Sequence, residues 1–206
     1  PIRVWLREIK HGVRVRRKPP FAAYYKERIV EFRRRNIQIL LDVGSAIDSG
    51  LAPALIMVRS KDHGKMFARV LSAPYIDGAD TQKKVKGKSN VKAVLERFLA
   101  GEFPVLVATS ILNVGVNLRP LRSAFNAAGG DSQIDIAQKA GRGVRLWPGK
   151  QFFDFFDYID DEPNYFRTHG LSREYVLKST FPKRCKSVKF ESVQRLVSAE
   201  SAEEAS

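Results

Sequence analysis

Short apolar runs alternate with amphipathic stretches through most of the chain. A short apolar run between turn residues is typical of a strand buried on both faces of a sheet. Apolar residues at helical spacing are typical of helices that cover such a sheet. The predicted strands are residues 54–58, 75–77, 105–108, 123–127 and 151–156, and the predicted helices are 61–71, 90–99, 131–142 and 171–178. Because strands separated by helices join in parallel crossover units, this order predicts an α/β fold with a mostly parallel sheet and helices on both faces.

The two ends of the chain have a different pattern from the middle. Residues 1–20 alternate apolar and basic side chains and close at two prolines, which predicts a strand-like or hairpin linker. A basic amphipathic helix is predicted over 21–35 and a second helix over 37–49. From residue 197 onward the residues are mostly small or acidic, which predicts a frayed end. We therefore divide the chain into a basic N-terminal linker and helix (1–35), an α/β domain (36–182) and a partly disordered tail (183–206).

Composition adds a strong positive charge to this picture. The 206 residues are 44% hydrophobic, which is typical of a globular domain with one core. Lysine and arginine number 36 against 22 acidic residues, which gives a net charge of +14. Such a balance is typical of proteins that bind nucleic acid, but ribosomal and membrane-surface proteins share it. Charge alone therefore selects no partner.

Cysteine and histidine are too sparse for metal or disulfide chemistry. Cys185 is the only cysteine, which excludes an internal disulfide and a cysteine-rich zinc site. The three histidines are far apart in the sequence, so we predict no metal site. We see no transmembrane stretch or signal peptide and expect no membrane partner and a cytoplasmic location, with a virus-encoded protein acting in the host cytoplasm as the alternative.

A glutamine and two arginines recur at helical spacing in one octapeptide, QKAGRGVR at 138–145. On a helix the side chains of Gln138, Arg142 and Arg145 lie on the same face. Gly141 has no side chain, so it leaves space beside them. Arginine offers a rigid fork that binds phosphate oxygens bidentately. The octapeptide is therefore suited to bind a polyanion at short range. Taken alone, it is equally consistent with a solvated basic face of a helix.

A second element, residues 104–118, lies upstream of this octapeptide. It reads as a buried strand that ends in Thr109 and Ser110, and the carboxyl ends of strands are where open α/β sheets bind ligands. Gly115 then allows the backbone to turn or to approach a partner closely. An ordinary strand and loop would look similar. The two elements in this order, with one predicted strand between them, are far less common.

The order and spacing of these elements resemble the C-terminal RecA-like domain of a superfamily 2 DNA helicase, nearest to the DNA-repair and phage-type branch. The resemblance covers roughly residues 36–180. It rests on residues 109–118 for motif V, 138–145 for motif VI, 54–60 with 63–71 for motif IV and its helix, and 75–78 with 94–102 for the connecting segment.

The resemblance implies how ATP would be handled. In such helicases ATP lies between two RecA-like domains, so Arg142 and Arg145 would contact the γ-phosphate as arginine fingers. Gln138 would position the arginines or the attacking water. The residues implied near the nucleotide are Gly115, Asn117 and Gly141. Asn117 stands where an aspartate is more usual, which would weaken or reorient its hydrogen bond.

The resemblance also implies contacts to a nucleic-acid backbone across the top of the sheet. Hydroxyls, short polar side chains and helix N-termini commonly hold phosphates. The implied contacts are Arg59, Ser60, His63, Thr109 and Ser110, and the basic segment that includes Lys83 and Lys84 would add salt-sensitive affinity. No element reads bases, so we expect tracking along DNA, with RNA as the alternative.

The sequence contains only half of an ATPase site. Gly87-Lys88-Ser89 ends like a phosphate-binding loop, but Gln82 stands where that motif needs a glycine. The acidic residues 160–162 read as a turn after a strand rather than as a Mg²⁺ site. We therefore expect an ATP-dependent helicase that works only together with an N-terminal RecA-like domain, joined in cis or paired in trans. That domain would bind ATP and provide most of the contacts to Mg²⁺. The alternatives are a non-catalytic RecA-like scaffold that binds nucleic acid and a basic structural protein with an unrelated α/β fold.

Overall fold

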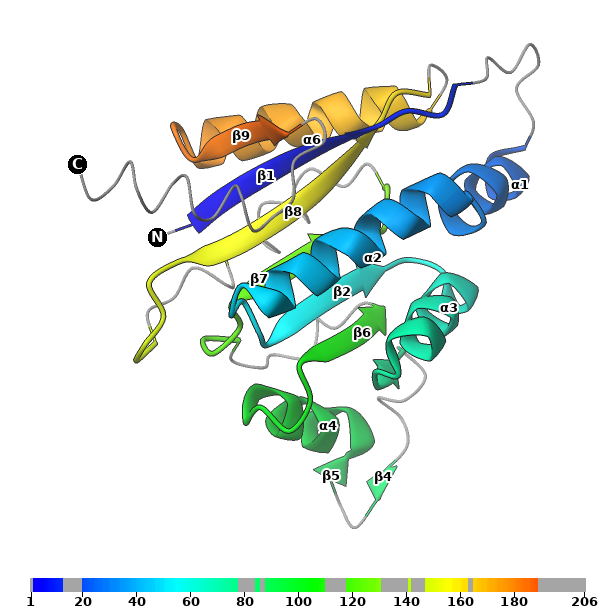
Figure 1. Cartoon of the computed structure of the whole chain (residues 1–206). Coiled ribbons are helices and arrows are strands. Elements are labelled where there is room, and N and C mark those ends of the chain that lie inside the picture. The colour runs from blue at the N-terminus through cyan, green and yellow to red at the C-terminus, as the bar shows by residue number, and fades with distance from the viewer. Residues whose placement is uncertain are drawn as a thin grey trace.

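A single parallel sheet forms the centre of the molecule (Figure 1). The computed structural model describes residues 2–12, 20–77, 84–85, 88–109, 118–130, 141, 147–162 and 165–188. The sheet has seven strands, in the spatial order β3 (Tyr75–Ile76), β6 (Val105–Thr109), β2 (Ala54–Val58), β7 (Ser123–Asn126), β8 (Phe153–Asp160), β1 (Ile2–Ile9) and β9 (Cys185–Val188). Every pairing in it is parallel. Two short strands, β4 (Lys84–Val85) and β5 (Lys88–Ser89), form a separate antiparallel pair.

Helices cover both faces of the sheet, as the alternating pattern predicts. One face packs against α2 (Arg33–Asp48) and α3 (Lys61–Leu71), and the other against α4 (Asn90–Leu99) and α6 (Phe166–Thr180). A further helical segment, α1 (Phe21–Tyr25) followed by the π-helical turn η1 (Lys26–Val30), packs its tyrosines against Phe166 of α6. Apolar side chains of alternating strand positions fill the two cores. The predicted α/β, RecA-like architecture is confirmed.

Several predicted elements coincide with observed ones. The strand predicted over 54–58 and the helices predicted over 61–71 and 90–99 have the observed limits. The helix predicted over 131–142 lies outside the described residues apart from Gly141. None of the helices within the described ranges is long and apolar enough to cross a membrane.

Residues 1–20 are predicted to form a strand-like or hairpin linker, and their first half is indeed a strand, but one that lies within the sheet. Residues 2–9 form β1, which pairs with β8 on one side and β9 on the other. Two of its basic residues, Arg3 and Arg7, are buried, with exposed fractions of 4% and 1%. Arg3 forms an ion pair with Asp154 of β8, and Arg7 with Asp42 of α2. Buried carboxylates thus allow a strand with alternating basic residues to lie inside the sheet.

Two other expected boundaries also move. The chain does not form one helix over 21–35, because η1 ends at Val30 and α2 begins at Arg33. Between them Phe32 has extended backbone, and its ring stacks on His11 with the ring centres 4.2 Å apart. The segment expected to begin the tail at residue 183 instead contributes β9, whose pairing with β1 extends the sheet. The sheet therefore uses residues from all three segments into which the sequence was divided.

Candidate functional site

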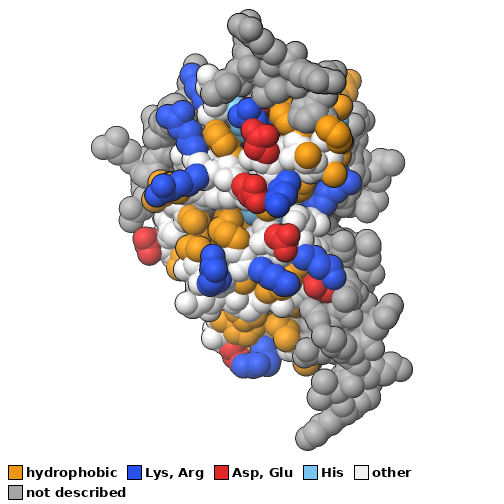
Figure 2. Space-filling view, turned by 90° about the vertical axis from the view of Figure 1, so that its right-hand side faces the viewer, with side chains coloured by type: hydrophobic (Ala, Val, Ile, Leu, Met, Phe, Trp, Pro, Cys, Tyr) orange, Lys and Arg blue, Asp and Glu red, His pale blue; other side chains and the backbone are white. Residues whose placement is uncertain are grey.

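The parallel strands bring their carboxyl ends to one edge of the sheet. Arg59 follows β2, Thr109 ends β6, Ala127 follows β7 and Asp160 ends β8. The helical segment of α1 and η1 lies at this same edge, on the right in Figure 1. Figure 2 views the molecule from this side, and lysine and arginine side chains are spread over it with acidic side chains among them. The carboxyl edge is the position at which open α/β sheets bind ligands.

Arg59 is exposed at this edge and is held by two aromatic rings. Its guanidinium carbon lies 5.7 Å from the ring centre of Phe21 and 5.7 Å from that of Tyr25. A cation–π contact uses the face of the guanidinium, so the N–H groups in its plane remain suited to bind an anion. The two rings therefore orient Arg59 without neutralising its charge.

Ser60 lies next to Arg59 and begins α3. It is the N-cap residue of that helix, is half-buried, and its side chain makes no capping hydrogen bond. The first backbone N–H groups of a helix have no partner within the helix and favour an anion. Arg59 and the N-terminus of α3 thus form a local arrangement that fits a phosphate group.

His63 does not fit the predicted role as a phosphate contact. It is completely buried, and its Nε2 lies 2.9 Å from Oδ1 of Asn36, whose own Nδ2 donates to the backbone carbonyl of Val30. Burial, followed by the positive charge of Arg35, lowers the pKa of His63 to about 3. His63 is therefore neutral at physiological pH and ties α3 to α2 in the interior. The prediction is corrected because the packing of α3 turns the side chain of His63 toward Asn36 of α2 and away from the solvent.

The remaining predicted site residues are described unevenly. Thr109 is 9% exposed at the end of β6, and the backbone of Lys84 lies in β4. Gly141 is helical and exposed. The other predicted residues lie outside the described ranges, namely Lys83, Ser110, Gly115, Asn117, Gln138, Arg142 and Arg145. Within those ranges, no group of three or more histidine, cysteine or acidic residues could hold a metal ion.

Three side chains hold the loop that follows β7, residues 127–130. Arg35 of α2 donates from Nη1 to the carbonyl of Ala127 at 3.0 Å, and the Tyr25 hydroxyl donates to the carbonyl of Ala128 at 2.7 Å. Arg173 of α6 donates from Nη1 to the carbonyl of Gly130. We call this arrangement the loop clamp. It fixes the backbone immediately before residue 131, where the segment containing Gln138, Arg142 and Arg145 begins.

Two carboxylates of β8 hold the arginines of the loop clamp in place. Asp160 accepts from Arg35 Nε at 3.1 Å and lies 2.9 Å from Nε2 of His11. Asp157 accepts from Arg173 Nε at 2.9 Å and from Asn126 Nδ2 at 2.7 Å. All of these side chains are buried, so each positive charge needs its carboxylate.

The loop clamp was not predicted from the sequence, although a signal was present. Asp154, Asp157 and Asp160 interrupt an otherwise apolar strand at regular intervals. Acidic residues are almost never fully buried unless they are paired. The strand therefore required basic partners elsewhere, but the sequence could not say which arginines supply them.

Comparison with known proteins identifies the domain. Residues 49–146 match the family model of the helicase conserved C-terminal domain. This match covers a little under half of the chain, and the RecA-like fold of the whole chain is shared with the solved helicase structures described next. No curated protein matches the sequence.

Solved structures with this fold come from several helicases. T4 UvsW is 17% identical with a TM-score of 0.65, and the match covers 91% of this chain and 42% of UvsW. The E. coli DEAD-box protein SrmB, bound to regulator of ribonuclease activity A, is 14% identical with a TM-score of 0.57 and coverages of 95% and 94%. S. cerevisiae Dbp5 L327V bound to RNA and ADP BeF3 is 11% identical with a TM-score of 0.62 and coverages of 98% and 45%. The chain thus spans less than half of UvsW and of that Dbp5 structure.

Proposed function

We propose that the chain is the C-terminal motor domain of an ATP-dependent superfamily 2 helicase or translocase. The match of residues 49–146 to the helicase conserved C-terminal domain carries this proposal. The matched region includes both elements that the sequence assigns to phosphate chemistry, residues 109–118 and 138–145. Its strands end at one edge, where Arg59 and the N-terminus of α3 offer positive charge and free N–H donors.

In this proposal Arg142 and Arg145 act as arginine fingers on the γ-phosphate of ATP. Gln138 positions them or the attacking water, and the backbone near Gly115, Asn117 and Gly141 lies beside the nucleotide. The loop clamp supports this assignment, because a finger acts only when its backbone is held in one place. Residues 127–130 lead directly into the segment that carries the fingers, and their carbonyls are held by three buried side chains.

ATP and Mg²⁺ would be bound mainly by a second RecA-like domain. The sequence has no complete phosphate-binding loop, and the chain spans 42% of UvsW. We propose that this N-terminal domain is joined to the chain in cis or pairs with it in trans. Closure of the two domains around ATP would then move the protein along a nucleic-acid strand.

The proposed nucleic acid is DNA, with RNA as the alternative. Arg59 and Ser60 are the proposed phosphate contacts that the described surface supports, because Arg59 is exposed and Ser60 begins α3. Thr109, Ser110, Lys83 and Lys84 remain proposed contacts. The net charge of +14 favours a polyanionic partner. T4 UvsW and the RNA-bound Dbp5 share the fold, which does not separate the two nucleic acids.

The test is ATP hydrolysis with and without nucleic acid, by this chain alone and by the native protein extended upstream. Turnover is expected only in the extended protein. Arg142→Ala and Arg145→Ala should each reduce kcat by about 10³-fold or more, the magnitude found for arginine fingers. Arg97→Ala is the control, because Arg97 is exposed on α4 and pairs with Glu102. Steady turnover by the chain alone, abolished by Arg145→Ala, would contradict the proposal.

The second candidate is a RecA-like scaffold that binds nucleic acid without hydrolysing ATP. The basic composition favours it as much as it favours the motor. If both forms of the protein are inactive while nucleic-acid binding stays salt-sensitive, the scaffold is the better assignment. The two aligned arginines in 138–145 argue for the motor, because a scaffold has no need of them.

A further inference from the structure

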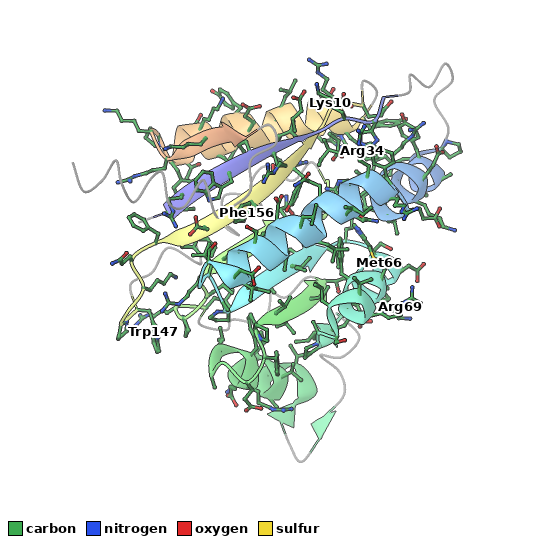
Figure 3. All side chains as sticks on the ribbon, viewed as in Figure 1. Lys10, Arg34, Met66, Arg69, Trp147 and Phe156 are labelled. Carbon is green, nitrogen blue, oxygen red and sulfur yellow. The ribbon has the colours of Figure 1, made fainter. Side chains whose placement is uncertain are left out.

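A cavity lies at the opposite, amino-terminal edge of the sheet, away from the carboxyl edge described above. Its volume is about 390 Å³. The cavity lies at the beginnings of β1, β7 and β8 and beside the turn after α2. The lining residues used below are Arg3, Gly50, Arg122, Gly149, Lys150 and Gln151. Figure 3 labels Trp147, which precedes this wall, at the opposite end of the molecule from Lys10 and Arg34. Arg59 and Ser60, the described residues proposed to contact phosphate, follow the carboxyl end of β2, whereas the cavity lies where strands begin.

Three basic side chains converge on this cavity. Arg3 has a structural role, because it donates two hydrogen bonds to Asp154. Its guanidinium carbon also lies 4.6 Å from the ring centre of Phe152. Arg122 is half-buried and lines the cavity beside Gly149. The described residues that line the cavity include no acidic side chain, and Asp154, the partner of Arg3, is fully buried. The cavity wall therefore carries an excess of positive charge.

The turn before β8 brings Lys150 and Arg122 to the same wall. Gly149 has a φ of +72°, a conformation that glycine adopts readily, and a Cβ added there would lie 3.7 Å from Nη2 of Arg122. Lys150 is 9% exposed, and its Nζ donates to the carbonyl of Arg119 at 3.0 Å and lies 5.1 Å from the ring centre of Phe153. Burial and the positive charge of Arg122 lower the pKa of Lys150 to about 8. The two cations thus repel each other across a shared space.

We propose that this cavity binds a phosphate-bearing ligand between Arg122 and Lys150. A dianionic phosphate would relieve the repulsion between the two cations and accept hydrogen bonds from both. The volume lies in the range of pockets for small ligands, which fits a phosphorylated molecule of about mononucleotide size. The phosphate can belong to a free small molecule or to a nucleic-acid backbone. This proposal does not depend on the helicase function.

The test is calorimetric titration of the full chain with inorganic pyrophosphate, at low salt and pH 7. Saturable binding is expected, and Arg122→Gln and Lys150→Gln should each weaken it roughly tenfold or more, the loss that one charge-assisted hydrogen bond produces. Lys150→Arg should retain most of the affinity. The matched control is Lys65→Gln, which removes one charge from the exposed surface of α3. No saturable binding by the unaltered chain, or equal affinity in all four variants, would overturn the proposal.

The source of the phosphate is decided by competition with a short single-stranded oligonucleotide. If the oligonucleotide displaces pyrophosphate, and Arg122→Gln weakens both, the cavity binds the nucleic-acid backbone. If the oligonucleotide binds without displacing pyrophosphate, the ligand is a free phosphorylated molecule. Pyrophosphate binding is measured on Arg122→Gln and Lys150→Gln, and ATP hydrolysis on Arg142→Ala and Arg145→Ala, so failure of the helicase proposal and failure of this one are separable.

Discussion

At the scale of single residues, burial decides what a polar side chain does. Histidine and lysine are both commonly assigned to phosphate contacts. In this structure one histidine, His63, and one lysine, Lys150, are buried. His63 has lost its charge and holds α3 to Asn36 of α2, whereas Lys150 keeps its charge close to Arg122. The identity of a residue therefore predicted its chemistry only where its exposure was also known.

His63 makes stability depend on pH in the acidic range. Its pKa is about 3 in the folded chain against about 6.5 when unfolded, so the stability from its neutral form is fully present above pH 6.5 and is lost as pH falls toward 3. Between these limits His63 should lower the free energy of unfolding by about 1.4 kcal/mol per pH unit. Urea unfolding of His63→Gln and of the unaltered chain at pH 6, 5 and 4 measures the difference in slope. Equal slopes would show that His63 does not take up a proton on unfolding.

At the scale of elements, the loop clamp joins three helical segments to one loop. Tyr25 precedes η1, Arg35 lies on α2 and Arg173 on α6, yet their donors meet the carbonyls of residues 127–130. These three residues lie outside the region 49–146 that matches the helicase conserved C-terminal domain. The flanking elements therefore contribute to the position of residues 127–130.

Removal of one hydroxyl from the loop clamp should affect turnover more than substrate binding. Burial raises the pKa of Tyr25 to about 12, so its hydroxyl stays protonated and donates to Ala128 at every working pH. Tyr25→Phe leaves that carbonyl without its donor, at a cost of about 1–3 kcal/mol. In the native two-domain protein we expect kcat for ATP hydrolysis to fall severalfold with little change in KM.

Tyr158→Phe is the matched control for this prediction. It also removes one buried hydroxyl, which donates to Asp42 at 3.2 Å rather than to a carbonyl of residues 127–130, and it keeps the ring that lies beside Arg35. Both variants should lose stability in thermal unfolding, but only Tyr25→Phe should lower kcat. The same loss of kcat in both variants would mean that the hydroxyl of Tyr25 acts through stability alone.

At the scale of the whole molecule, buried ion pairs connect segments that are far apart in the sequence. Arg3 and Asp154 are 151 residues apart, Arg35 and Asp160 are 125 apart, and Arg7 and Asp42 are 35 apart. Each pair joins neighbouring strands or a strand to a covering helix. These pairs cannot form before the sheet does, so they select one arrangement of the chain rather than drive its collapse.

The contribution of a buried ion pair to stability can be measured at the pair of Arg7 and Asp42. Arg7→Met should lower the free energy of unfolding by about 3–5 kcal/mol, because it leaves Asp42 buried without its partner. The double variant Arg7→Met with Asp42→Leu should recover much of that loss, since neither charge remains. Urea unfolding gives both values. Arg97→Met, which breaks an exposed pair, should change stability by less than about 1 kcal/mol. A double variant no more stable than Arg7→Met would contradict this account.

Local pattern was enough to predict much of the sheet and its helices. Residues 54–58, 61–71 and 90–99 have clear periodicity, and the structure gives them the predicted limits. The sequence also placed Arg59 and Ser60 correctly at the end of a strand. It failed for His63, because the side of α3 on which that residue lies depends on how the helix packs. For residues 2–9 it predicted a strand-like segment, but not that this strand lies within the sheet.

The sequence by itself determined the fold class of this protein, since local periodicity along the chain encodes the order of its strands and helices. Only the tertiary structure decided which charges are buried and which remain available. That decision depends on contacts between residues separated by tens to more than a hundred positions, as Arg3 with Asp154 and Arg122 with the turn at Gly149 show. A single sequence carries no record of such contacts, because desolvation and pairing arise only when the strands come together.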